Sequence, residues 1–160
     1  MIDSLLALCI TVQVLGMSDY REKKAWDYMP QIIKSSKIHD IKPEIIIALI
    51  FVESSFNRKS VSHMNACGLT QVIPKYTGRI TKSYSCSQLK NPKTSIKAGT
   101  KILRWWIDYH GGNVKRALCS YNAGFRCSSK RPSRGGMKYA KKVLEKSRLL
   151  EDKKNQLISN

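Results

Sequence analysis

Residues 43–74 read PEIIIALIFVESSFNRKSVSHMNACGLTQVIP, which is the pattern of a buried helix that turns into a polar loop. Pro43 suits the first turn of a helix, and Glu44 suits its positive N-terminus. A single carboxylate, Glu53, ends the apolar run, and the next acidic residue is Asp108. The pattern therefore predicts one acid at the end of an apolar helix, followed by 54 residues without another.

The position of Glu53 on this helix predicts its chemistry. It follows Ile50, Leu49 and Ile46 by three, four and seven residues, so all four share one helix face. The carboxyl should lie at the rim of the core, where burial disfavours its charged form and raises its pKa. Such an acid suits proton donation to a glycosidic bond. Considered alone, however, Glu53 is better explained as a capped or salt-bridged glutamate at a helix end.

The composition indicates one globular domain with an uneven charge. The chain has 160 residues, 42% of them hydrophobic, and a net charge of +18. Residues 81–160 carry 19 Lys/Arg against 4 Asp/Glu, a net of +15, whereas residues 1–80 carry only +3. This excess favours an anionic cell-wall or envelope polymer as a partner, and a solvated basic face is the alternative. No nucleic-acid-binding pattern is present, so we expect no specific nucleic acid.

Helical periodicity dominates the rest of the chain. We expect a helix within 20–37 that Pro30 breaks locally, and another over 91–112 from Asn91–Pro92 to the paired glycines. A short helical piece is expected through LTQV at 69–72, a helix over 113–124, a basic loop over 125–136 and a last helix over 137–150. Strands are scarce, and TKSYS at 81–85 would join a small hairpin at most. The fold class is therefore mainly α, as a single compact domain.

The two ends of the chain are expected to lie outside this domain, which we place at 20–150. Residues 1–19 hold a short apolar stretch that reads either as an export or anchor signal or as a first packing helix. A signal normally has a basic start, and this one has Asp3 and no Lys or Arg before Arg21. Residues 151–160 form a polar tail.

The cysteines indicate an oxidising compartment, because five is a high number for a reducing one. Cys9 stands apart. The other four allow three pairings, of which the shortest loops favour Cys67–Cys86 and Cys119–Cys127; free buried thiols are the alternative. A metal site is not expected, because the chain has no CxxC or HxxxH pattern.

Two ordered motifs carry a family resemblance. Residues 53–74 resemble the signature of the lytic transglycosylases, the soluble-lytic-transglycosylase branch of the lysozyme-like superfamily. The matching positions are Glu53-Ser54, Phe56-Asn57, Ser62, Ala66, Gly68-Leu69, Gln71 and Pro74. A second block, ALCSYNAG at 117–124, resembles the later A-Y-N-A-G motif of the family. The resemblance covers roughly residues 26–148.

The resemblance implies a lysozyme-like helical domain with a cleft for the glycan strand of peptidoglycan. It implies that Glu53 is the single catalytic acid and base, and that the enzyme needs no cofactor or metal. Substrate contacts are implied for Ser62, Gln71, Ile73, Tyr121 and Asn122. The tyrosine of the second motif reaches the catalytic glutamate or the sugar in the family. Three positions depart from the usual residues, Thr70, Ile73 and Ser120, so the sugar contacts are expected to differ.

The carboxylate pattern agrees with the reaction that the resemblance implies. Most glycosidases use two carboxylates, and residues 54–107 offer no second one. The expected product is 1,6-anhydro-MurNAc, formed when the MurNAc-GlcNAc bond is cleaved. A muramidase or chitin-type hydrolase with Asp108 or an N-terminal acid as partner, and a catalytically silent wall-binding or structural module, remain the alternatives. We expect an isolated domain to be a monomer, free or within a virion or secretion assembly, that works in the periplasm, outside the cell or on a virion.

Overall fold

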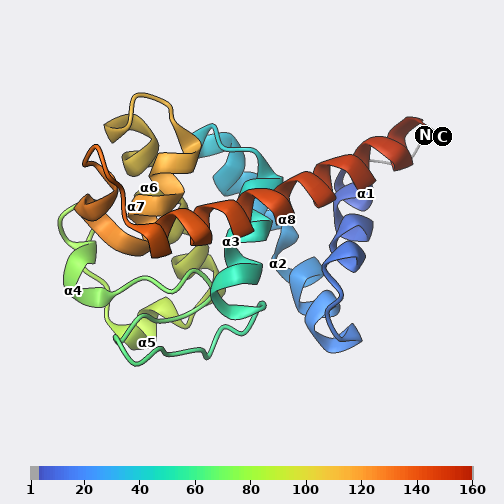
Figure 1. Ribbon diagram of the computed structural model, residues 1–160. Coiled ribbons are helices and arrows are strands. Elements are labelled where there is room, and N and C mark those ends of the chain that lie inside the picture. Colours follow the sequence, from blue (N-terminus) through green and yellow to red (C-terminus); the bar gives the residue numbers. More distant parts are fainter. Residues whose placement is uncertain (1–3, 160) are drawn as a thin grey trace.

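The computed structural model describes residues 4–159, and helices make up most of this range (Figure 1). The described elements are, in chain order, α1 (Ser4–Thr11), η1 (Val12–Leu15), α2 (Asp19–His39), α3 (Pro43–Ser54), α4 (Pro74–Thr77), α5 (Cys86–Leu89), α6 (Pro92–Tyr109), α7 (Val114–Ala123), η2 (Gly124–Cys127) and α8 (Arg134–Ser159). No strand forms within residues 4–159, where the β-structure is limited to two isolated bridges. The mainly α fold class is confirmed.

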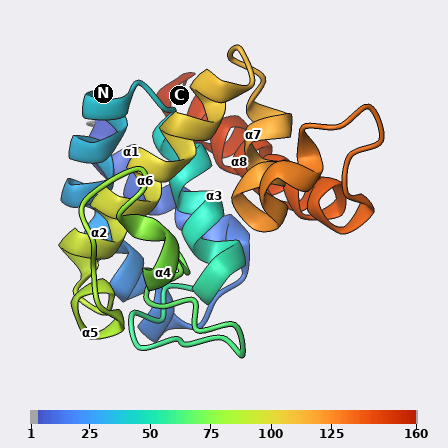
Figure 2. The ribbon, with the colours of Figure 1, turned by 90° about the vertical axis from the view of Figure 1, so that its left-hand side faces the viewer.

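Helix α3 occupies the centre of the domain. Pro43 takes its first position, as predicted, and every residue from Glu44 to Ile50 is buried. Helices α2 and α8 pack against it, while α6 packs against α2 and α7, and α7 packs against α8 (Figure 2). The largest fully buried side chains of the main core are Phe56, Met29, Ile32, Ile46, Ile47, Leu49, Ile50, Leu69, Ile96, Leu103 and Leu118. The apolar run of α3 thus becomes the core of the fold.

Asparagine caps set the starts of α6 and α7. The Asn91 side chain accepts a hydrogen bond from the Thr94 amide at 3.2 Å, and Asn113 accepts one from the Arg116 amide at 2.9 Å. This satisfies amides that have no partner within the helix. The predicted helix over 91–112 is confirmed, with Asn91 as its cap and an earlier end at Tyr109. Trp106 on its inner face is buried, while Trp105 is only half-buried, so only one of the two points fully inward.

Helix α8 is longer than the sequence predicted. It runs from Arg134 to Ser159, so the expected bounds of 137 and 150 are wrong at both ends. Figure 1 shows it crossing α3 and continuing to α1. The extension is anchored because Lys154 pairs with the buried carboxylate of Glu44, and Lys42 pairs with Glu151 at 2.6 Å. Residues 151–159 are therefore a packed helical end and not an extended tail.

The predicted break at Pro30 is also wrong, since α2 continues through it. Pro30 is exposed, whereas Met29 and Ile32 beside it are completely buried. Proline removes one hydrogen bond from a helix interior. Here that loss falls on the solvent side, and the packing of the apolar face against the core keeps the helix continuous.

The segment LTQV is not helical, contrary to prediction. It forms a turn in which Gln71 has a φ of +48°, and Cys67 makes antiparallel bridges to Val61 and Val72. A second, smaller core cluster lies here and includes Cys67, Tyr84 and Leu89. The first helix after the turn is α4, with Pro74 in its first turn.

The described part of the N-terminal segment packs into the main core. Leu8, Val12 and Leu15 are buried in the same cluster as α2 and α3. This arrangement corresponds to the packing-helix alternative, while Asp3 lies outside the described residues. No helix within residues 4–159 is both long and apolar enough to cross a membrane.

Candidate active site

Glu53 lies in the last turn of α3, with its side chain partly exposed. The helix ends directly after it because Ser55 and Phe56 both adopt positive φ, at +47° and +61°. Phe56 is almost fully buried, and its burial holds this turn in place. The sharp exit of the chain leaves the Glu53 carboxyl at the edge of the core.

The carboxyl of Glu53 has one hydrogen-bond partner among the described residues. The Tyr139 hydroxyl on α8 donates to Glu53 Oε1 at 2.5 Å. Burial raises the pKa of Glu53 from 4.5 to about 7, and the hydrogen bond from Tyr139 opposes that rise. Within residues 4–159 no lysine, arginine or second carboxyl is paired with Glu53. The expected rise in the pKa of Glu53 is confirmed, and its cause is burial of the carboxyl.

Tyr139 was missed by the sequence analysis, which assigned the contact with Glu53 to Tyr121. The sequence could have indicated this contact, because Tyr139 lies on the inner face of the last helix and a buried tyrosine hydroxyl needs a hydrogen-bond partner. Burial and the negative charge of Glu53 raise the pKa of Tyr139 well above 10. The hydroxyl therefore remains a donor at any physiological pH.

Tyr121 on α7 bonds the loop instead of the carboxyl. Its hydroxyl donates to the Thr70 carbonyl oxygen at 2.8 Å. Burial raises the pKa of Tyr121, and the charge of Glu53 raises it further, so the two groups lie close enough to interact. Tyr121 thus ties α7 to the loop that follows the glutamate.

Thr70, a departure from the family pattern, is fully buried against α6. Its hydroxyl donates to the Ser95 carbonyl at 2.8 Å, and Gly99 leaves the room for it. A Cβ at Gly99 would lie only 2.4–2.7 Å from the Thr70 side chain. Thr70 therefore docks the loop on α6.

The predicted sugar-binding polar residues Gln71 and Ser62 hold the loop together. The Gln71 side-chain amide donates to the carbonyls of Ser60 and Gly68 at 3.1 and 3.0 Å. The Ser62 hydroxyl accepts from the amides of Met64 and Ala66.

Ile73 and Asn122 complete the predicted set. Ile73 is half-buried directly before α4, and Asn122 is exposed near the end of α7. Among residues 4–159 the Asn122 side chain makes no hydrogen bond within the protein. Both positions remain predictions as substrate contacts.

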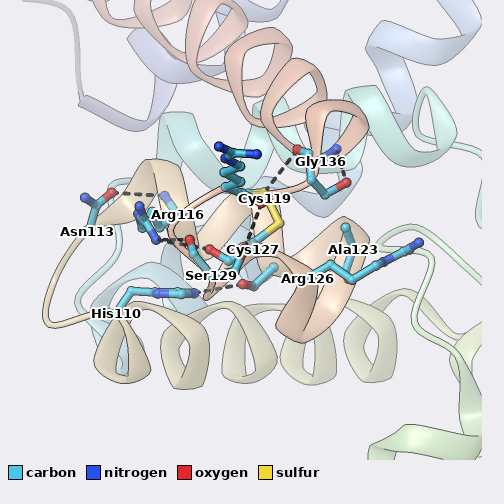
Figure 3. The surroundings of a disulfide bond; sticks show 12 residues. His110, Asn113, Arg116, Cys119, Ala123, Arg126, Cys127, Ser129 and Gly136 are labelled. Atoms are coloured by element: carbon cyan, nitrogen blue, oxygen red, sulfur yellow. Dashed lines mark hydrogen bonds between the residues drawn. A yellow bond between two sulfur atoms is a disulfide. The ribbon is translucent and has the colours of Figure 1, made fainter.

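Two disulfides flank the site. Cys67 is bonded to Cys86 and Cys119 to Cys127, as the short loops favoured, and Cys9 is a buried free thiol. Figure 3 shows the second disulfide between α7 and the start of α8. Within residues 4–159 no cluster of three metal-binding side chains occurs.

The fold and site together define a lysozyme-like helical domain with one partly buried carboxyl at the end of its central helix. The family model of the Transglycosylase SLT domain matches residues 30–144, and the chain belongs to this family.

Curated relatives and solved structures agree with this assignment. Membrane-bound lytic murein transglycosylase C of Haemophilus ducreyi is 36% identical over 99 residues, which are 58% of this chain and 27% of that protein. The protein of the same name from Yersinia pestis (strain Pestoides F) is 30% identical over 129 residues, 72% of this chain and 36% of its own length. This chain therefore spans about a third or less of these relatives.

The solved structures share the fold at lower identity. An inactive mutant of the lytic transglycosylase Slt from Pseudomonas aeruginosa has a TM-score of 0.71 and 22% identity, over 79% of this chain and 24% of that one. The 70 kDa soluble lytic transglycosylase in complex with bulgecin A has a TM-score of 0.70 and 23% identity, over 92% of this chain and 28% of that one.

Proposed function

We propose that this chain is a lytic transglycosylase that cleaves the MurNAc-GlcNAc bond of peptidoglycan with Glu53 as its only acid and base. The observation that carries the proposal is the environment of Glu53. Its pKa of about 7 provides a proton donor at neutral pH, and no second carboxyl is paired with it within residues 4–159. The family and the names of the curated relatives support the same reaction.

In this proposal the same carboxyl carries out two successive steps. Neutral Glu53 first donates its proton to the glycosidic oxygen, and the bond between that oxygen and C1 of MurNAc breaks. The N-acetyl group of the same sugar stabilises the cationic centre at C1. The Glu53 carboxylate then takes the proton of the C6 hydroxyl, whose oxygen bonds to C1. The ring closes as 1,6-anhydro-MurNAc, and Glu53 regains its proton without any water entering the product.

Tyr139 supports the charged half of this cycle. Its hydroxyl donates to the carboxylate that remains after the first proton transfer. A hydrogen bond to the charged form stabilises it, so Tyr139 makes Glu53 a stronger acid than burial alone would allow.

The test is mass spectrometry of purified peptidoglycan sacculi after digestion. Transglycosylation leaves 1,6-anhydro ends, whereas a muramidase adds one water at each cut. We expect anhydro ends with the wild type and no products with Glu53→Gln, while Glu145→Gln, an exposed glutamate on α8, should match the wild type. Reducing ends, or more than a few per cent of activity in Glu53→Gln with an unchanged circular dichroism spectrum, would contradict the proposal.

We propose the cell envelope, outside the reducing cytoplasm, as the site of action. Two disulfides favour an oxidising compartment, and the relatives are named membrane-bound. The net charge of +15 on residues 81–160 would concentrate the enzyme on anionic wall and envelope polymers.

A further inference from the structure

Two neighbouring glycines at the start of α8 have very different surroundings. A Cβ on Gly136 would lie 2.7 Å from Cys119 Sγ, 2.9 Å from Cys127 Sγ and 3.0 Å from the Ala123 Cβ, whereas one on Gly135 would meet nothing within 4 Å. In Figure 3 Gly136 lies directly beside the Cys119–Cys127 disulfide. The first turn of α8 thus rests on the two sulfur atoms, at a separation that only glycine allows.

Tyr139 follows Gly136 by three residues, which places both on the same side of α8. Its hydroxyl is the donor to Glu53 Oε1 at 2.5 Å. Because a helical turn moves as a unit, the depth at which Gly136 sits on the disulfide also sets the position of the Tyr139 ring.

The support under Gly136 is itself fixed to α7. Arg116 donates to the carbonyls of Cys127 and Ser129, each at 3.3 Å. The Ser133 hydroxyl accepts from the Gly136 amide at 3.2 Å. The two Arg116 bonds hold η2 against α7, and the Ser133 bond caps the first turn of α8, so the segments on both sides of the disulfide are fixed by hydrogen bonds.

We propose that the Cys119–Cys127 disulfide and Gly136 are positioning elements that hold Tyr139 against Glu53 and so set the acid strength of that carboxyl. The effect of this contact on catalysis rests on the proposed function. The position of Tyr139 relative to Glu53 can be measured whether or not that function is correct.

The sign of the effect follows from the groups that face Glu53. These are Tyr139 from α8 and Tyr121 from α7, and the hydroxyl of Tyr121 is already bonded to Thr70. Among residues 4–159 no other charged group shifts the pKa of Glu53. Since the Tyr139 bond lowers this pKa, lifting Tyr139 away must raise it further.

The experiment compares Gly136→Ala with Gly135→Ala as its matched control. Both changes add one methyl group to the same helical turn, but only the first meets the disulfide. The primary measurement is the NMR titration of the Glu53 side-chain carboxyl carbon, assigned by its loss in Glu53→Gln. The second is the pH profile of kcat/KM on a soluble glycan.

We expect Tyr139→Phe to raise the midpoint of Glu53 by on the order of one pH unit, because the lost hydrogen bond favours the charged form. Gly136→Ala should raise it by roughly half as much, and Gly135→Ala should leave it unchanged. The decline of kcat/KM at high pH should move upward with the midpoint, because the neutral acid then persists to higher pH. In a Tyr139→Phe background, Gly136→Ala should add no further shift.

Two results would overturn the inference. One is a folded Gly136→Ala protein with the same midpoint as Gly135→Ala, and the other is a full shift that persists without the Tyr139 hydroxyl. If Gly136→Ala does not fold, the double variant Cys119→Ala/Cys127→Ala takes its place and should raise the midpoint in the same way. Activity retained by Glu53→Gln would instead refute the proposed function and leave the titration result standing.

Discussion

Replacing Glu53 by glutamine should stabilise the fold while it abolishes activity, and the gain should depend on pH. The folded protein holds Glu53 with a pKa of about 7, against 4.5 for an ordinary glutamate. Between these two values the folded state binds more protons than the unfolded state, so the free energy of unfolding falls as the pH rises. Below pH 4.5 both states are protonated and Glu53 carries no penalty.

The pKa shift of Glu53 sets how much its charged form destabilises the fold. Each pKa unit is worth about 1.4 kcal/mol, so the full difference would reach about 3 kcal/mol above pH 7. Because the Glu53 side chain keeps some contact with solvent, we expect about 2–3 kcal/mol. For a chain of this size that corresponds to a rise in Tm of roughly 5–10 °C. Glutamine has nearly the same shape and can still accept the hydrogen bond from Tyr139.

The assay is urea and thermal unfolding of the wild type and Glu53→Gln at pH 4 and pH 8. The variant should match the wild type at pH 4 and exceed it at pH 8. Glu145→Gln is the control, since its exposed pair with Lys141 is worth less than about 0.5 kcal/mol at either pH. A stability difference for Glu53→Gln that is equal at both pH values would show that burial does not perturb this carboxyl, and the reasoning would fail.

Three further predictions concern other parts of the chain. Lys154→Ala should destabilise the fold by about 3–5 kcal/mol in urea unfolding because it leaves the buried Glu44 unpaired. Lys42→Ala removes an exposed pair and should cost under about 1 kcal/mol. Equal losses in the two variants would show that the Lys154–Glu44 pair does not anchor α8. Raising the salt concentration should weaken sacculus binding far more than cleavage of a short soluble glycan, because the charge of residues 81–160 acts over about 8–10 Å. Equal losses of binding and of cleavage would show that this charge also shapes the substrate site. Thiol titration of the unfolded, unreduced protein should find one free thiol, at Cys9, and five would refute both disulfides.

The helices that carry the site could be predicted because local signals and burial agree along them. The apolar run before Glu53 made the end of α3 visible, and the asparagine caps marked α6 and α7. The rise in the pKa of Glu53 followed from helical spacing alone, since that spacing already put its carboxyl at the core edge.

The failures came where distant contacts override local preference. Pro30 did not end α2 because the packing of its apolar face outweighs one lost hydrogen bond. Gln71 sits in a turn because its amide bonds the loop backbone, an arrangement that no local spacing announces. Tyr139 is 86 residues from Glu53, and only the crossing of α8 over α3 brings them together.

The path of α8 has a consequence for how the domain opens. One helix holds α3 at both ends, through Lys154 on Glu44 and through Tyr139 on Glu53. Local unfolding of either end of α8 would release one end of α3, whose amides lie in the centre of the core. In native-state hydrogen exchange the two helices should therefore form a single cooperative unit, while the turns of residues 55–73 exchange through smaller openings. The Glu53 carboxyl, our proposed acid and base, should therefore belong to the slowest-exchanging unit of the domain.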